Sequence, residues 1–229
     1  MAGGTAVGGY LAGQGVLLSR LQDRYVTVKG VAEAELKADL AVMPLRFTLT
    51  AADVRDGQAQ VEATTRTVAD FLKARGFAED EIAPGRVEVQ DRTAQGMERN
   101  NPATRYVLNR TVTVRSGDVD KITALDRATG DLLRAGVVLG GGEGPSYIVT
   151  AERLNAVKPD LIRRATEAAR KSAEEFADLS GSAIGAIRRA NQGVIVIQAR
   201  DPGENNYEPH FVDKRIRAVA TVDYYLAQR

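Results

Sequence analysis

The chain has 229 residues and a hydrophobic content of 44%, which is enough to fill the core of one large domain or of two small ones. Its 31 basic and 30 acidic side chains nearly cancel, so no overall electrostatic field attracts a polyanion, and we expect no nucleic-acid partner. The absence of cysteine excludes disulfides, thiolate catalysis and thiolate metal ligands.

The first 19 residues contain no charged side chain, and a helix of that length nearly spans a bilayer. Glycines recur four positions apart, which is the spacing by which membrane helices pack closely, and they are Gly4, Gly8, Gly9 and Gly13. The basic region of a secretory signal is absent, and Arg20 and Arg24 favour a cytoplasmic side for the chain after them. Residues 1–22 are therefore predicted to be a membrane anchor, a signal remnant or a flexible glycine-rich tail.

The first half of the remaining chain alternates between strand and helix patterns. Apolar residues at every second position predict strands, and Asp53 and Gly76 are suited to begin and end a helix between them. Gly30 predicts a bend or bulge, and Pro44 places the start of its strand at a sheet edge. The predicted elements are strands over residues 24–38, 43–50, 86–90 and 106–115 and a helix between Asp53 and Gly76.

The second half contains the longest predicted elements. Pro159 is placed in the first turn of a helix, where a residue without a backbone donor is tolerated. A narrow stripe of mostly small side chains lets this helix lie close on a sheet, and its members are Leu161, Ile162, Ala165, Ala169, Phe176 and Leu179. The other elements are a helix from Asp118 to before Gly136 and strands over residues 146–151, 194–197 and 212–226. The last strand reaches about 50 Å, so it must bend, serve two sheets or extend beyond its own domain.

About seven strands and three helices, with short connections between the strands, predict an α+β fold. We expect mostly antiparallel sheets packed against the helices. No low-complexity linker divides the chain, so residues 23–229 are predicted to form one continuous unit with two lobes. The helix after Pro159 and the closing strand are expected to build the second lobe.

The strongest polar cluster lies just after the long helix and consists of Arg188, Arg189, Asn191 and Gln192. Two arginines and two amides can bind a carboxylate or a phosphate through paired hydrogen bonds. The arginines can equally form ion pairs with an acidic turn of a neighbouring subunit, for which residues 79–81 are the candidates. We expect the structural role, because a basic pair without catalytic companions is typical of an ion-pair site.

The only histidine, His210, lies near the carboxylates Asp201, Glu204 and Glu208, and such a group can bind a divalent cation or assist proton transfer. These residues lack helical or paired ligand spacing, and no serine stands in a hydrolase-type turn. The glycine run over residues 140–144 is not followed by Lys-Ser or Lys-Thr, so it predicts a tight connection. The sequence therefore predicts no catalytic residue, no metal and no cofactor.

Three stretches together resemble a known family. Residues 154–193, LNAVKPDLIRRATEAARKSAEEFADLSGSAIGAIRRANQG, carry its most characteristic pattern. Residues 24–39 resemble its opening strand and the start of its second, and residues 214–226 resemble its closing strand. The chain is thus similar to the SIMPL family of exported bacterial proteins over nearly its whole length. The resemblance implies a periplasmic location at the cell envelope and no agreed set of catalytic residues.

The leading hypothesis is a non-enzymatic protein that forms a homo-oligomer and is anchored to the inner membrane by residues 1–22. The long closing strand, the N-terminal glycine spacing and the lack of a catalytic constellation favour assembly. A ring-like or channel-like shape and a role in envelope or oxidative stress are implied by the resemblance alone. Two other hypotheses stay open: a periplasmic module that binds a small ligand or peptide through residues 188–192, and a hydrolase that uses His210.

Overall fold

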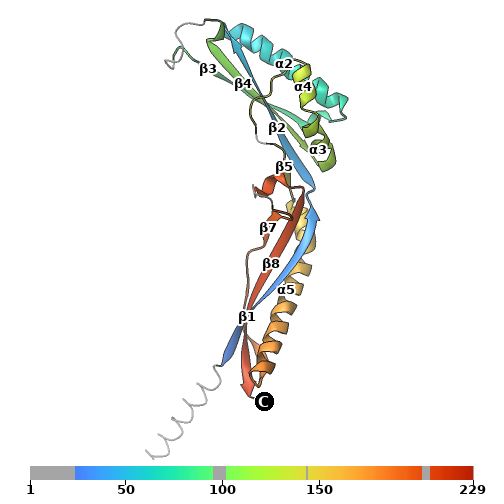
Figure 1. Ribbon diagram of the computed structural model, residues 1–229, viewed down its shortest axis with the longest axis vertical. Coiled ribbons are helices and arrows are strands. Elements are labelled where there is room, and N and C mark those ends of the chain that lie inside the picture. The colour runs from blue at the N-terminus through green and yellow to red at the C-terminus, as the bar shows by residue number, and fades with distance from the viewer. Residues whose placement is uncertain (1–23, 95–101, 143, 203–206, 229) are drawn as a thin grey trace, which may run out of the picture. The chain divides into compact units, whose positions relative to one another are not determined.

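The computed structural model describes residues 24–94, 102–142, 144–202 and 207–228. The chain divides into two compact units, each with a sheet and helices that pack against it (Figure 1). Unit 1 comprises the described residues within 1–36, 151–198 and 215–229, and unit 2 those within 37–150 and 199–214. The predicted α+β class with antiparallel sheets is confirmed.

Unit 2 contains a four-stranded sheet in the order β3-β4-β2-β5, and its neighbouring strands pair antiparallel. The strands are β2 (Leu40–Ala51), β3 (Ile82–Asp91), β4 (Tyr106–Ser116) and β5 (Ser146–Ile148). The helices are α2 (Val54–Ala74), α3 (Val119–Arg127) and α4 (Gly130–Arg134), so the second predicted helix is divided in two. Large apolar side chains from both layers form the core, including Phe47, Leu72, Leu108 and Ile122.

Several local predictions in unit 2 are confirmed. Asp53 caps α2, because its carboxylate accepts a hydrogen bond from the Arg55 N–H at 2.7 Å. Gly76 follows the last turn with a φ of +82°, a conformation that favours glycine. Pro44 lies where β2 has β4 on one side and, within the described residues, no ladder partner on the other.

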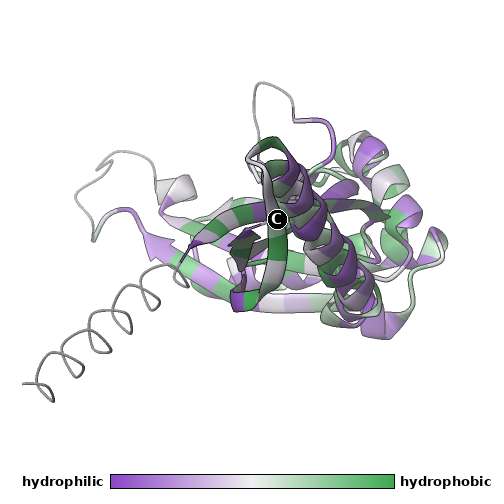
Figure 2. Ribbon diagram, turned by 90° about the horizontal axis from the view of Figure 1, so that it is seen from below, coloured by the Kyte–Doolittle hydropathy of each residue, from purple (hydrophilic) through white to green (hydrophobic). Residues whose placement is uncertain are grey.

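Unit 1 contains a sheet in the order β1-β8-β6, with β7 also paired to β8. Its elements are β1 (Tyr25–Lys37), α5 (Ala151–Leu179), β6 (Ser182–Gln192), β7 (Val196–Ala199) and β8 (Asp213–Gln228). α5 runs along one face of the sheet (Figure 1), and in Figure 2 hydrophobic and hydrophilic residues alternate along the strands. β8 begins in unit 2 and enters unit 1 after Lys214, so the long closing strand does extend beyond its own unit.

The helix α5 begins eight residues before the predicted start, since its first residue is Ala151 and Pro159 lies in its interior. An interior proline removes one backbone hydrogen bond and costs about 3 kcal/mol. The first two turns nevertheless form, because Leu154 and Val157 pack against the apolar cluster of unit 1. Tertiary packing thus outweighs the local cost of the proline, and the prediction of a first-turn position was wrong.

The buried stripe of α5 is narrower and more regular than predicted. It advances by four residues at a time and consists of Leu161, Ala165, Ala169, Ala173 and Ala177. Phe176 and Leu179, which were assigned to the stripe, are 48% and 91% exposed. The buried face therefore follows the small alanine side chains and not the largest apolar ones.

Gly30 is the point at which β1 meets α5 most closely. A Cβ at Gly30 would lie 1.9 Å from the carbonyl oxygen of Ala165 and 2.3 Å from the backbone nitrogen of Ala169. Both distances are far below van der Waals contact, so no side chain fits there. β1 continues through Gly30 as one strand. The glycine permits close approach of the helix, and the predicted bend or bulge stays a prediction.

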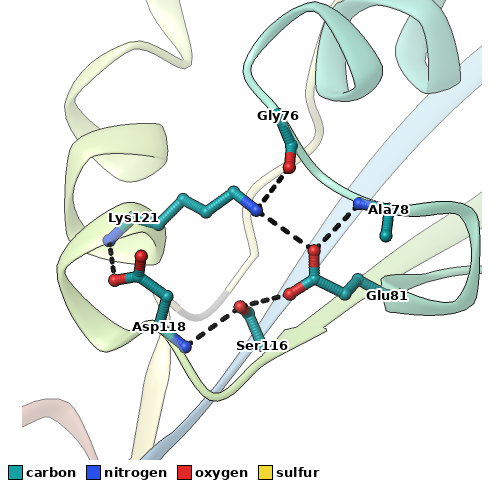
Figure 3. Close-up of polar contacts among 6 residues, drawn as sticks. All are labelled: Gly76, Ala78, Glu81, Ser116, Asp118 and Lys121. Carbon is teal, nitrogen blue, oxygen red and sulfur yellow. Dashed lines mark hydrogen bonds and ion pairs between the residues drawn. The ribbon is translucent and has the colours of Figure 1, made fainter.

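A polar network in unit 2 is centred on Glu81, which belongs to the 3-10 helix η1 (Glu79–Glu81) (Figure 3). Its carboxylate accepts hydrogen bonds from the Ser116 hydroxyl and from the Ala78 N–H, the latter at 2.9 Å. Lys121 Nζ lies 3.1 Å from the same carboxylate. These contacts, with the Ser116 hydrogen bond as the largest cause, lower the pKa of Glu81 from its ordinary value.

The same network joins the end of α2 to the start of α3. Lys121 Nζ donates to the carbonyl oxygen of Gly76 at 2.6 Å and lies 4.2 Å from the ring centre of Phe77. Ser116 Oγ accepts from the Asp118 N–H at 3.1 Å, and the Asp118 carboxylate caps α3 by accepting from the Lys121 N–H. Glu81 therefore holds two helix ends and the end of β4 together.

Replacement of Gly30 by alanine is expected to destabilise unit 1 strongly. The added methyl group would push α5 away from β1, and overpacking of this kind costs about 1–3 kcal/mol. Thermal unfolding followed by circular dichroism should show a lower Tm for Gly30→Ala. Gly130→Ala is the matched control, because a Cβ at Gly130 has no neighbour within 4 Å. Equal melting temperatures for Gly30→Ala and the parent chain would show that the close approach is unimportant.

Glu81→Gln is expected to lower the free energy of unfolding by about 1.5–3 kcal/mol at pH 7, the scale of a hydrogen bond to a charged group. Because the folded-state pKa is lowered, the stabilisation is present above the ordinary glutamate pKa and is lost as the pH falls through the folded-state value. Urea unfolding of both proteins from pH 7 to pH 3 should therefore show a difference that shrinks with acid. Glu79→Gln is the control, since Glu79 is 89% exposed. A difference independent of pH would contradict the assignment.

Candidate functional site

The predicted polar cluster lies on β6, a strand that the sequence pattern did not predict. Two register shifts, one on each side of Ile187, interrupt the pairing of β6 with β8. Such bulges break the alternation of inward and outward side chains, so the strand pattern is lost in the sequence. Two glycines are the sequence feature that could have indicated this strand, because glycine in a strand often marks a close approach of another backbone. A Cβ at Gly185 would lie 3.1 Å from a carbonyl oxygen of β8, and a Cβ at Gly193 would lie 3.0 Å from another.

The structure does not bring the four cluster residues to one point. Gln192 is paired in register with Ala220, which is buried beneath α5, so Gln192 lies on the helix side of the sheet. Arg189 and Asn191 alternate with it and belong to the opposite side. A single ligand held by all four side chains is therefore not supported.

The two arginines have different surroundings. The Arg188 guanidinium lies 4.0 Å from the ring centre of Tyr25, within the range of a cation–π contact. Arg189 lies directly opposite Asp223 of β8, whose carboxylate accepts a hydrogen bond from the Thr27 hydroxyl at 2.7 Å. Within the part of the chain that the structure describes, the guanidinium of Arg189 has no hydrogen bond or ion pair. Arg189 is thus the cation of this cluster that is available to another molecule.

A groove of about 270 Å³ lies between α5 and the β6 side of the sheet. Close contact at Gly30 places the helix against β1, and small side chains on β8 and β6 leave space beside it. Gln192, on the helix side of the sheet, lines the groove together with mostly apolar residues, among them Ile162, Ala165, Ile187, Ala190, Ala220 and Val222. The groove suits an apolar side chain, and the Gln192 amide is a polar group in its lining.

The groove borders the open edge of β6. The Gly193 N–H donates to the Val219 carbonyl oxygen of β8 at 2.8 Å. In an antiparallel pair, inward and outward backbone groups alternate along the strand, so the N–H groups of Ala190 and Gln192 point away from β8. No strand within the described residues pairs with that side of β6. An added strand could therefore bond to this edge and place a side chain in the groove.

Unit 2 has a comparable open edge at β3, which pairs with β4 alone within the described residues. Its side chain Val89 is 47% exposed. Glu88 has only an exposed ion pair with Arg86 at 3.3 Å. Asp91, by contrast, is bound by Arg105 at 2.8 Å, and this contact is the largest cause of its lowered pKa. The accessible carboxylate of the edge is therefore Glu88.

The residues around His210 do not converge. Nδ1 of His210 lies 3.0 Å from the carbonyl oxygen of Pro145, Glu208 forms an ion pair with the buried Lys214 at 2.5 Å, and Asp201 pairs with Arg200. Glu204 lies outside the described residues. Across the described ranges, no group of three or more His, Asp or Glu side chains is placed to bind a metal ion.

Other predicted features have partners within the fold. Glu81 of the acidic turn is used inside unit 2 (Figure 3), so it is unsuited to a subunit contact, whereas Glu79 and Asp80 remain at the surface. The glycine run after Leu139 lies along β2, because the Gly140 N–H donates to the Arg46 carbonyl oxygen at 2.8 Å. A tight connection, as predicted, is what the structure shows there.

Residues 1–22, with the glycines Gly4, Gly8, Gly9 and Gly13, lie outside the described residues. In the part of the chain that is described, none of the helices has the length and apolar character needed to cross a bilayer.

Comparison with known proteins supplies the family. A search among curated proteins finds no match. The model of the SIMPL family, described as a protein of unknown function (DUF541), matches residues 26–224, which includes both units and the strand that carries the polar cluster. The chain therefore belongs to the SIMPL family.

Proposed function

We propose that the chain is a non-enzymatic protein that assembles with copies of itself at the bacterial cell envelope. The single observation that carries this proposal is that β6 in unit 1 and β3 in unit 2 are long edge strands that pair on one side only within the described residues, as β1 also does. Unpaired backbone groups along an edge strand are a template for pairing with another chain. Exposed apolar side chains accompany both edges, Ile187 at 53% and Val89 at 47%.

The place of assembly is inferred from the family resemblance and from the sequence. A periplasmic location, with residues 1–22 as an anchor in the inner membrane, agrees with the absence of charge over the first 19 residues and with their glycine spacing. A ring-like or channel-like form and a link to envelope or oxidative stress belong to the same proposal.

A second candidate function is the binding of a small ligand or a peptide by unit 1. The groove between α5 and β6 favours it, because apolar walls lie beside an open strand edge and an available arginine. This is the arrangement by which many domains add an extended peptide to a sheet. We propose no hydrolase activity, since His210 is directed at a backbone carbonyl oxygen.

Assembly is tested by the mass of the full-length chain in mild detergent, measured by mass photometry. We expect particles of several copies. Ala190→Pro should reduce the assembled fraction, because it removes an outward N–H from β6 and leaves the inward hydrogen bonds to β8 intact. Loss of one hydrogen bond of about 1.4 kcal/mol per contact raises the dissociation constant about tenfold.

Ala190→Ser serves as the matched control, since it changes the same side chain and keeps the backbone donor. Circular dichroism should show that both variants are folded. Particles of single-chain mass for the parent protein, at micromolar concentration, would refute the assembly function.

A further inference from the structure

Two of the open edges, β6 and β3, carry opposite charges. Residues 189–192 of β6 pair with β8 without a register shift. This stretch includes Arg189, which has no ion-pair partner within the described residues. The regular part of β3 spans residues 87–91 and includes the accessible carboxylate of Glu88. Opposite charges on neighbouring strands stabilise a sheet, whereas like charges directly opposite destabilise it.

Pairing of β6 with a second β6 is therefore disfavoured. Such a pair is isologous, so it brings Arg189 of both copies to the same short interface together with Arg188. Pairing of β6 with β3 has no such conflict, since each arginine meets a strand that carries a carboxylate.

The hydrogen-bonding groups of the two edges also match. On β3, the Arg92 N–H donates to the Arg105 carbonyl oxygen of the neighbouring chain segment at 3.0 Å. By alternation, the N–H groups of Val87 and Val89 point to the open side. On β6 the outward groups are those of Ala190 and Gln192. The Asp91 N–H also points outward by the same alternation, so β3 offers three outward donors and β6 offers two, in both cases spaced by two residues.

Of the registers that these groups allow, one brings the carboxylate of Glu88 next to Arg189. Hydrogen-bonded pairs join Val89 to Ala190 and Val87 to Gln192, which places Glu88 opposite Asn191 and diagonal to Arg189. Directly opposite residues share a face, so the half-exposed Val89 lies on the side of Ala190, which lines the groove beneath α5. In this register one partner strand fills the apolar groove with Val89, places Glu88 near Arg189 and forms hydrogen bonds with the edge of β6.

We propose that β6 of one copy pairs antiparallel with β3 of a second copy, with Val89 of that copy seated in the groove between α5 and β6. The inference rests on the proposed assembly function and names its interface. This contact joins two different surfaces, so each copy offers one of each to its neighbours. A heterologous contact of this kind closes into a ring when the rotation between copies permits it.

The natural absence of cysteine gives a direct test. Asn191→Cys is introduced into one preparation of the full-length chain and Glu88→Cys into another, since non-hydrogen-bonded cross-strand pairs lie about 4.5 Å apart at Cα. On mixing and mild oxidation, we expect a disulfide-linked dimer on a non-reducing gel, and little from either variant alone. Gln60→Cys, at an exposed position on α2, replaces Glu88→Cys as the control and should not link.

Several outcomes would overturn the interface. A dimer from Asn191→Cys alone shows that β6 pairs with itself. Multi-copy particles in which Asn191→Cys and Glu88→Cys do not link show that assembly uses another surface, and the assembly function then survives without this interface. Single-chain mass for the unmodified protein removes the assembly function itself. Because all variants retain the parent chain outside one exposed residue, a folded circular dichroism spectrum makes each result decisive.

Discussion

The arrangement of unit 1 depends on the contact between Gly30 of β1 and the backbone of α5 at Ala165 and Ala169. With hydrogen in place of a side chain, the helix lies on β1 at a distance that even a methyl group would prevent. The alanine stripe of α5 extends this close contact along the helix. Because the helix is fixed over β1 and β8, the outer strand β6 is only partly covered, and the groove at its side is a direct result.

The open edges are also limited by their own irregularities. β6 contains register shifts on both sides of Ile187, and β3 contains one between Pro84 and Val87. Bulges, proline and charged side chains are the features by which proteins prevent uncontrolled pairing of edge strands. Only short regular stretches remain on each edge. A partner must therefore match them in length, hydrogen-bond phase and charge, which favours specific pairing over aggregation.

The sequence predicts elements well where one local rule dominates and poorly where tertiary packing decides. The caps at Asp53 and Gly76 are set by local chemistry, and the structure confirms both. Pro159 was placed at a helix start because local cost was the only information available, whereas the packing of the preceding turns sets the true start. β6 was missed because its bulges erase the period of two. The groove depends on where α5 lies over the sheet of β1, β8 and β6, and no local sequence pattern determines that position.

Several carboxylates of the described residues hold the fold together. Glu208 pairs with the fully buried Lys214, Asp91 with Arg105, and Glu81 with Ser116 and Lys121. Removing Glu208 would leave the buried charge of Lys214 uncompensated, so that carboxylate is constrained to a structural role. The outward backbone groups of β6 are not constrained in this way. The recognition by strand edges that we propose uses these outward N–H and carbonyl groups, so it does not compete with the ion pairs that stabilise the fold.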